Sequence, residues 1–396
     1  MEPLREALLT GPLPEFLPTR EPLEAYGAEL VKPLWRELRN EQGTKDRRLR
    51  AGMALAGLEP SQALSTAEEG QEGPPAWTAA DAAFVVGQLL ASNPEFQGEM
   101  RKALRPVAAL LLPEIERKLV DEQLEKVQRN AAATAVADYA GGDSERLARL
   151  LPRATGEQFE ILYPVFERVV SPENRASLAT QVVTLPPADM EPVPRIAFGK
   201  ERANAATMLL RLGEKEAALK VCDMTDDPEA LSQFLFACRP RGVPVGTLLA
   251  CLDLVSAAAP GQFEPQVKYA LLIALGEYPV EELPAEERER RIEQLAEWYL
   301  NDPSSTVHGA AGWLLRQWGA TEQAEEVERT EVKYGPGREW YTEVVEVQPE
   351  GKNEGVLGLL SKKPPKQKIA MTFIVFPAGE YEVGSEPEEE ALGRFD

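Results

Sequence analysis

One helical pattern recurs along the chain and limits what it can fold into. Each copy places small residues early and larger apolar residues later, and four of the five copies end at or just before a glycine. The copies are "RNAAATAVADYAGG" from Arg129, "RANAATMLLRLGE" from Arg202, "VKYALLIALGEY" from Val267, "VHGAAGWLLRQWG" from Val307 and a weaker "RRLRAGMALAGLE" from Arg47. Self-similarity of this kind predicts that similar helices form most of the chain.

The spacing within the copies is helical. Apolar residues lie four and then three or four positions apart: Ala132, Val136 and Tyr139 in one copy, Ala205, Leu209 and Leu212 in a second, and Ala310, Leu314 and Trp318 in a third. Such spacing puts them on one face of a helix. The early alanines leave room for a neighbouring helix. Gly141, Gly213 and Gly319 are expected to stop these helices, because glycine adopts the left-handed C′ conformation at no steric cost.

Further apolar faces lie between the copies. "RRIEQLAEWYL" places Ile292, Leu295 and Tyr299 on one stripe, and Asp302-Pro303 should end that helix. Ser304, Ser305 or Thr306 can then cap the next helix by accepting from its free backbone N–H groups. The sequence therefore predicts helix, turn and small-residue helix in repetition.

This repeat pattern predicts a mainly α fold. Within that class it predicts an α-solenoid of degenerate HEAT-like repeats, because stacking of successive helix pairs supplies the core that one pair lacks. An irregular helical domain without solenoid symmetry is the alternative. Residues 59–77 are rich in Ser, Gly, Glu and Pro and are expected to be a loop. The proline-rich stretch 184–195 cannot be a helix interior and either links two subdomains or forms a loop. We favour the loop, since the helical pattern resumes at Glu201.

Composition restricts the setting and the partners. The 396 residues carry a formal net charge of −22, which should repel nucleic acid and anionic membranes while remaining compatible with a basic partner. The start has no signal-peptide pattern, and no stretch approaches a membrane span. Three cysteines are too few and too irregular for a disulfide framework. We expect a cytoplasmic protein.

Residues suited to catalysis or metal binding are sparse. His308 is the only histidine, no serine lies in a nucleophile elbow, and we expect His308 to be a packing or surface residue. Cys222, Cys238 and Cys251 lie in or near apolar helical stretches and are expected to be buried small hydrophobic residues rather than metal ligands. Phosphate-binding and kinase motifs are absent. We assign no catalytic, cofactor-binding or metal-binding residue.

Two charged clusters have a functional and a plainer interpretation. The basic run "KKPPKQK" (362–368) could anchor an acidic partner or a phosphate, but no aromatic residues interleave it and we favour a solvated loop. The carboxylate pairs Glu287-Glu289 and Glu325-Glu326 are expected to be solvated helix faces. The same holds for "PEEE" (387–390), although an acidic loop could bind a cation in a complete domain.

The pattern changes after Val327. "YGPGREWYTEVVEVQPEG" (334–351) begins with turn residues and continues with alternating, β-branched ones. "MTFIVFPAGEYEVGS" (371–385) has an apolar run, a Pro377-Ala378-Gly379 turn, and then Tyr381 and Val383 alternating with glutamates. We expect a hairpin-like element that either docks on the last helices or is poorly ordered, since two strands with one exposed face are marginal alone.

These terminal motifs carry a resemblance. "GREWY" (337–341), "MTFIVFPAGEYEVGS" (371–385) and the final "GRFD" (393–396) resemble the start of the formylglycine-generating enzyme, or sulfatase-modifying factor, domain. "HGAAGWLLRQWG" (308–319) before them resembles the helical-repeat region of large bacterial multidomain proteins that carry this domain at their C-terminus. The family has a C-type-lectin-like fold and oxidises a sulfatase cysteine to formylglycine with copper and oxygen.

The resemblance transfers a domain identity but no catalytic residue. The family's active-site cysteines lie late in the domain, and Cys222, Cys238 and Cys251 do not match them because all three lie in the helical part. No cofactor is expected in this chain, and copper or calcium is conceivable only for a complete C-terminal domain. The long stretch between "GREWY" and "MTFIV" also departs from the family pattern.

The predicted organisation is a HEAT-like domain over residues 1–330, with a possible sub-boundary near 184–196, followed by a linker and enzyme-domain fragment over 331–396. The predicted function is a non-catalytic scaffold that binds a protein partner, not nucleic acid or a membrane. The alternative is part of an oxidoreductase that converts a protein cysteine to formylglycine, with its catalytic residues missing from this chain. The oligomeric state is left open.

Overall fold

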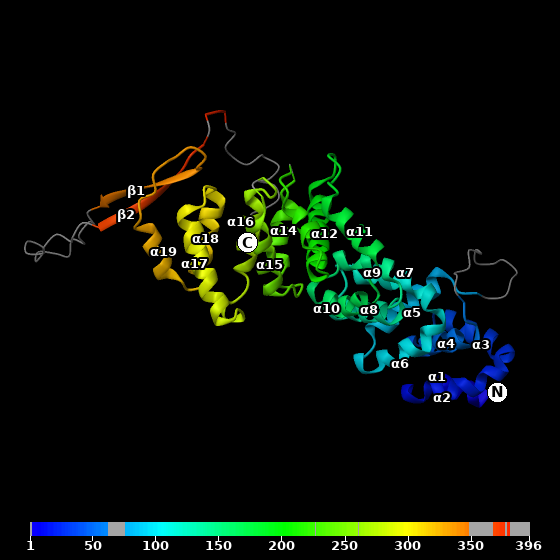
Figure 1. Cartoon of the computed structure of the whole chain (residues 1–396). Coiled ribbons are helices and arrows are strands. Elements are labelled where there is room, and N and C mark those ends of the chain that lie inside the picture. The colour runs from blue at the N-terminus through cyan, green and yellow to red at the C-terminus, as the bar shows by residue number, and fades with distance from the viewer. Residues whose placement is uncertain are drawn as a thin grey trace, which may run out of the picture. The chain divides into compact units, whose positions relative to one another are not determined.

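A computed structural model describes residues 2–61, 76–225, 227–259, 261–347, 367–376 and 378–380. The chain is mainly helical and has one small two-stranded sheet near its C-terminus (Figure 1), which confirms the predicted mainly α class with a short β segment. Its contacts divide it into two compact units, Met1–Leu248 and Leu249–Asp396. The predicted domain division at residue 330 stays a prediction.

The first unit consists of helices. They are α1 (Glu2–Thr10), α2 (Phe16–Arg20), α3 (Gly27–Arg39), α4 (Lys45–Leu58), α5 (Ala79–Ala91), α6 (Pro94–Leu104), α7 (Ala108–Leu119), α8 (Lys126–Tyr139), α9 (Ser144–Leu150), α10 (Gly156–Val169), α11 (Pro172–Val183), α12 (Pro192–Arg211), α13 (Lys215–Leu219) and α14 (Glu229–Ala237). Short 3₁₀ turns lie between several of them. The main contacts join helices close in sequence, such as α3 with α4, α7 with α8, and α11 with α12.

The second unit contains the remaining helices and the sheet. Helix α15 (Val245–Ala257) contains the point of division, and α16 (Pro265–Leu275), α17 (Ala285–Asn301), α18 (Ser305–Gln317) and α19 (Thr321–Glu328) follow it. Strands β1 (Trp340–Val347) and β2 (Gln367–Ile374) pair antiparallel in a continuous register, from Trp340 opposite Ile374 to Val347 opposite Gln367. Helix α18 packs against both α16 and α17.

Small residues in the recurring copies permit close packing, as their pattern predicted. A Cβ atom added to Gly52 in α4 would lie 2.9 Å from the side chain of Val85 in α5. One added to Gly312 in α18 would lie 2.7 Å from the ring of Tyr299 in α17. Two other copies also bury the apolar residues of their predicted faces, namely Ala132, Val136, Ala205 and Leu209. These helix faces therefore form part of the core.

Some helix ends lie where the sequence predicted them, and others do not. Gly213 and Gly319 have φ angles of 84° and 75°, as predicted for left-handed stops. The same prediction is wrong for Gly141, which lacks a positive φ: α8 ends at Tyr139, and the helical turn closes through the N–H of Ala140 bonded to Val136. Helix α12 starts at Pro192 rather than Glu201. Prolines fit the first turn of a helix, because the backbone N–H groups there have no acceptor within the helix.

Other predictions fall partly outside the described residues. Most of the expected loop 59–77, the "PEEE" segment, "GRFD" and the Tyr381–Val383 arm lie outside them. Of the basic run 362–368, only Gln367 and Lys368 are described, and they begin β2. The strand partner of β2 within the described residues is β1, which the prediction from residues 371–385 alone did not identify.

Candidate functional site

The junction between the sheet and the helices brings together the chain's only histidine and two aromatic residues. The His308 ring stacks on Trp340 of β1, with centroids 3.6 Å apart and planes at 24°, and lies 4.6 Å from the Tyr299 ring of α17. All three side chains are buried. Trp340 Nε1 also donates to the backbone carbonyl of Asp302 at 2.8 Å. We call His308, Trp340 and Tyr299 the aromatic junction.

His308 is held in one orientation. Its Nδ1 lies 2.6 Å from the carbonyl oxygen of Tyr299, and because a carbonyl can only accept, Nδ1 carries the hydrogen. Burial lowers the pKa of His308 below its usual value, and the nearby Arg338 guanidinium acts in the same direction. The imidazole is therefore a neutral packing group near pH 7, which agrees with the packing role expected for it.

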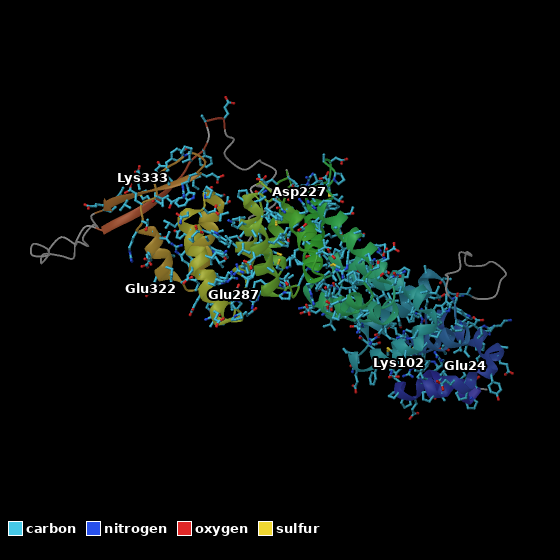
Figure 2. All side chains as sticks on the ribbon, viewed as in Figure 1. Glu24, Lys102, Asp227, Glu287, Glu322 and Lys333 are labelled. Carbon is cyan, nitrogen blue, oxygen red and sulfur yellow. The ribbon has the colours of Figure 1, made fainter. Side chains whose placement is uncertain are left out.

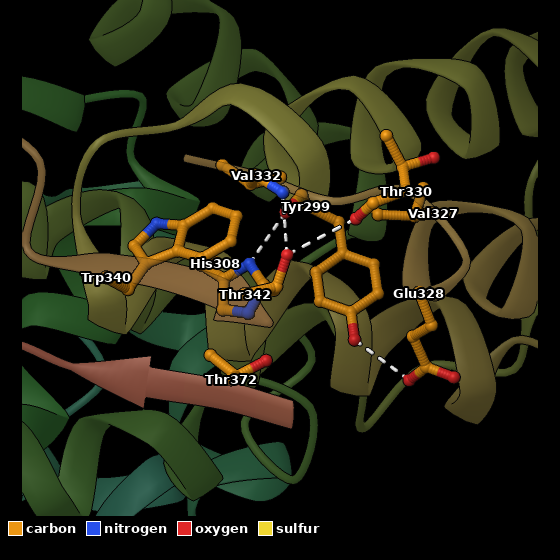
Figure 3. A pocket seen from close by; sticks show the side chains of 9 residues that line it. All are labelled: Tyr299, His308, Val327, Glu328, Thr330, Val332, Trp340, Thr342 and Thr372. Carbon is orange, nitrogen blue, oxygen red and sulfur yellow. Dashed lines mark hydrogen bonds between the residues drawn. The ribbon is translucent and has the colours of Figure 1, made fainter. Parts of the chain in front are cut away.

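A small polar cavity lies beside the aromatic junction. Figure 3 shows the side chains that line it, with the Tyr299 hydroxyl directed at Glu328. Its volume is about 50 Å³, room for one to a few water molecules but not for a metabolite. The hydroxyl of Thr342 accepts from the Val332 N–H at 2.7 Å and lies 3.3 Å from the Thr330 carbonyl. The cavity is therefore too small to serve as a substrate pocket.

The N-terminus of α18 is capped from the loop that leads into β1. Ser304 occupies the N-cap position, but its side chain makes no capping hydrogen bond; the predicted cap is wrong. A carboxylate oxygen of Glu339 instead accepts from the Ser305 N–H at 2.8 Å and the Ser305 hydroxyl at 3.0 Å. Local sequence could not predict this, because Glu339 is 34 residues away. Glu339 and Trp340 together anchor the sheet to the helices.

The cysteines and carboxylate pairs form no reactive group. Cys222, Cys238 and Cys251 are buried, as expected. Among the residues that the structure describes, no group of three His, Cys, Asp or Glu side chains could hold a metal ion. Glu287 is not simply solvated: it pairs with Arg290 and Arg291 at 2.7 Å each, which lowers its pKa. Figure 2 shows Glu287 and the exposed Glu322 among the charges of this unit.

The strongly perturbed arginines are structural. Arg241 is buried and donates to the carbonyls of Leu151 and Ala154, and burial lowers its pKa to about 10. Arg20 is buried too and donates to the carbonyls of Met53 and Ala103, at 3.1 and 2.8 Å. Each guanidinium therefore satisfies carbonyls from separate segments, which is a packing role rather than a catalytic one.

Each unit also has a larger groove. In the first unit, a groove of about 910 Å³ between α9, α11 and α12 is lined mainly by hydroxyl, amide and charged groups. Its arginines are engaged, Arg153 with Glu201 at 3.0 Å and Arg149 with Glu116 at 2.7 Å. In the second unit, a groove of about 300 Å³ is lined by Trp313 and Tyr269 over Gly309 and Ala310, with Ile374 of β2 at its margin. Neither holds an acid–base pair arranged for catalysis.

The outer face of the sheet is aromatic and partly exposed. Tyr341 stacks on Phe373 across the strands at 5.2 Å, and Tyr334 packs edge-on against Tyr341 at 6.2 Å. Tyr334 is 58% exposed and Met371 is 48% exposed. Since side chains alternate between the faces of a strand, these residues lie opposite buried Trp340. We call Tyr334, Tyr341, Met371 and Phe373 the outer aromatic face.

The described residues form a helical protein with an anchored β-hairpin, and none of them covers the outer aromatic face completely. Within the described residues, no helix is both long enough and apolar enough to cross a membrane. No family model, curated protein or solved structure matches the chain.

Proposed function

We propose that the chain is a non-catalytic, cytoplasmic scaffold of HEAT-like helical repeats that binds a protein partner, joined to the start of a sulfatase-modifying-factor-like domain. The observation that carries the proposal is the outer aromatic face. Large apolar side chains gathered on a surface mark sites of protein interaction more often than scattered ones do. Tyrosine is favoured in such places because it buries much area and loses little conformational freedom.

The support beneath this face favours binding over local unfolding. The buried Trp340 ring and the Glu339 carboxylate fix β1 to α17 and α18, so the outer side chains are presented on a rigid base. A preorganised surface loses less entropy when a partner docks. The acidic chain, with a net charge of −22, favours a protein over nucleic acid as that partner.

Site-specific photocrosslinking in cells tests this function. A photoreactive phenylalanine analogue replaces Tyr334, and a matched control replaces Tyr26, which is 48% exposed in the first unit. We expect a discrete adduct with another protein from position 334, absent from position 26 and weakened by Tyr341→Ser. An adduct pattern identical at both positions, or no heterologous adduct at 334, would contradict a partner on the outer aromatic face.

The alternative function is part of an oxidoreductase that forms formylglycine, and one observation favours keeping it. The motif residues Met371–Ile374 do form a strand, with apolar side chains that further strands of a larger domain would cover. Incubation of this chain with copper, oxygen and a cysteine-containing sulfatase peptide should give no formylglycine, because no cysteine matches the family's positions. Turnover would overturn the scaffold proposal.

A further inference from the structure

The two edges of the β-hairpin are not equivalent. The outer edge of β1 is covered near its start, since the Thr342 N–H donates to the Val332 carbonyl at 2.9 Å. Across residues 367–374, the outer edge of β2 has no backbone partner from any other described segment. One strand of the sheet therefore presents a row of backbone donors and acceptors that the described chain leaves unused.

The register identifies which groups face this edge. The Val375 N–H donates to the Glu339 carbonyl at 2.7 Å and continues the ladder by one position, so Val375 is a hydrogen-bonded residue of the pair. Hydrogen-bonded and non-hydrogen-bonded positions alternate in an antiparallel pair. Met371 and Phe373 therefore point their backbone groups at β1. Lys368, Ala370, Thr372 and Ile374 point theirs outward.

Apart from Lys368, this edge lacks the features that keep strands apart. The one-to-one register over eight residues has no bulge, and residues 367–374 contain no proline and a single charge, Lys368. Ile374 is 56% exposed and Met371 is 48% exposed. A regular, largely apolar edge with one charge near its end is a template for adding another strand.

We propose that this edge pairs with the β2 edge of a second copy of the chain, antiparallel and centred on Met371. In that register Ala370 lies opposite Thr372 of the second copy, and Lys368 lies opposite Ile374. All four outward residues then have backbone partners, and the two hairpins form a four-stranded sheet. A two-fold rotation axis through the midpoint between the two Met371 residues relates the two strands, as a closed dimer requires.

The charges suit this partner. In the centred register no like charges face each other across the seam, because Lys368 meets Ile374. The acidic residues Glu343 and Glu346 lie on β1, one strand away from the seam. Repulsion between two chains of net charge −22 acts over a longer range and is screened by salt. Pairing is therefore expected to strengthen as ionic strength rises.

Sedimentation equilibrium of the full chain, from low micromolar to submillimolar concentrations, tests the proposal. A seam of one short strand is smaller than a standard interface, so we expect a concentration-dependent dimer that increases with added salt. Thr372→Pro removes an outward N–H without touching the ladder to β1 and should abolish the dimer. Thr372→Val keeps that N–H and should dimerise like the unsubstituted chain. A monomer at every concentration and salt level would overturn the proposal.

Cysteine crosslinking tests the register even if the proline variant misfolds. Met371 faces its own counterpart at a non-hydrogen-bonded position, where Cα atoms lie about 4.5 Å apart, a span that suits a disulfide. Met371→Cys should therefore form a covalent dimer on oxidation. Phe373→Cys should not, because its counterparts lie four residues out of register. Equal crosslinking of both variants, or equal hydrogen-exchange protection of the Ala370 and Thr372 amides at all concentrations, would contradict the pairing.

The seam shares Met371 with the outer aromatic face, but the two proposals are tested at different residues. Tyr334 lies before β1, away from the seam, so a foreign adduct at position 334 and a dimer sensitive to Thr372→Pro are separate results. A self-adduct at 334 would have twice the mass of the chain and would not count toward a foreign partner.

Discussion

Helix α18 and the β1–β2 hairpin lie in the same unit and both contain many apolar residues. They differ in how far those residues are exposed to solvent. In α18 the residues Ala310, Ala311, Leu314 and Leu315 are all buried. In β2 the described side chains from Met371 to Ile374 are exposed. A helix satisfies its own backbone and needs only one packed face, whereas two strands leave an edge and a face open. An apolar residue in such a hairpin is therefore available for another chain.

The largest expected effect tests the anchor that joins these two regions. Trp340→Ala removes a fully buried side chain and should destabilise the docked hairpin by about 3–5 kcal/mol. Hydrogen exchange of the β1 amides, together with denaturant unfolding, measures this loss. Tyr334→Ala, at an exposed ring, should change stability little. Equal effects of the two variants would show that the hairpin does not depend on the aromatic junction.

A glycine pair in α18 tests how tightly the helical region is packed. Gly312→Ala places a methyl group against the Tyr299 ring and should destabilise the fold by about 1–3 kcal/mol, because that ring is held by its contacts with His308 and Glu328. Gly309→Ala has open space around it and should stabilise the helix by about 0.5–1 kcal/mol. Thermal unfolding compares them. A stabilising Gly312→Ala would mean that the α17–α18 contact yields easily.

The cap of α18 tests whether the hairpin supports the helix in return. Glu339→Ala leaves the Ser305 N–H without its acceptor and should cost about 0.5–2 kcal/mol. Glu343→Ala, at an exposed β1 position, serves as the control for charge alone. Urea midpoints of both variants decide the matter. If Ser304 rotates to replace the lost acceptor, the two midpoints will coincide and the proposed mutual support is wrong.

The smallest expected effect is a pH dependence of the aromatic junction. The pKa of folded His308 is lowered by burial, so the unfolded chain binds the proton more readily. The stabilising contribution is complete above the unfolded pKa and declines as pH falls through about 6.5 toward the folded value. Unfolding followed by tryptophan fluorescence from pH 7.5 to 5.5 should show this decline. His308→Phe should remove that component, and an unchanged slope in the variant would assign it to other groups.

The sequence predicted the helices better than it predicted the candidate surface. The period of small and apolar residues placed Ala132, Val136, Ala310 and Leu314 on buried faces. This was predictable because residues three or four positions apart in the sequence lie on the same face of a helix. For His308 the sequence left packing and surface positions open, and the structure shows that it is buried. The outer aromatic face had no comparable signal, since Phe373 is 32 residues away in sequence from Tyr341, against which it stacks.

By itself, then, the sequence predicted the helices of the recurring copies, apolar residues on their buried faces, and a short β segment near the end of the chain. The tertiary structure alone decided that β2 pairs with β1, that His308 stacks on Trp340, and that Glu339 caps α18. The physical reason is the separation along the chain of the residues that interact. Periodicity and turn chemistry act between neighbouring residues, whereas strand partners, ring stacks and caps between distant segments depend on which surfaces meet once the helices have packed.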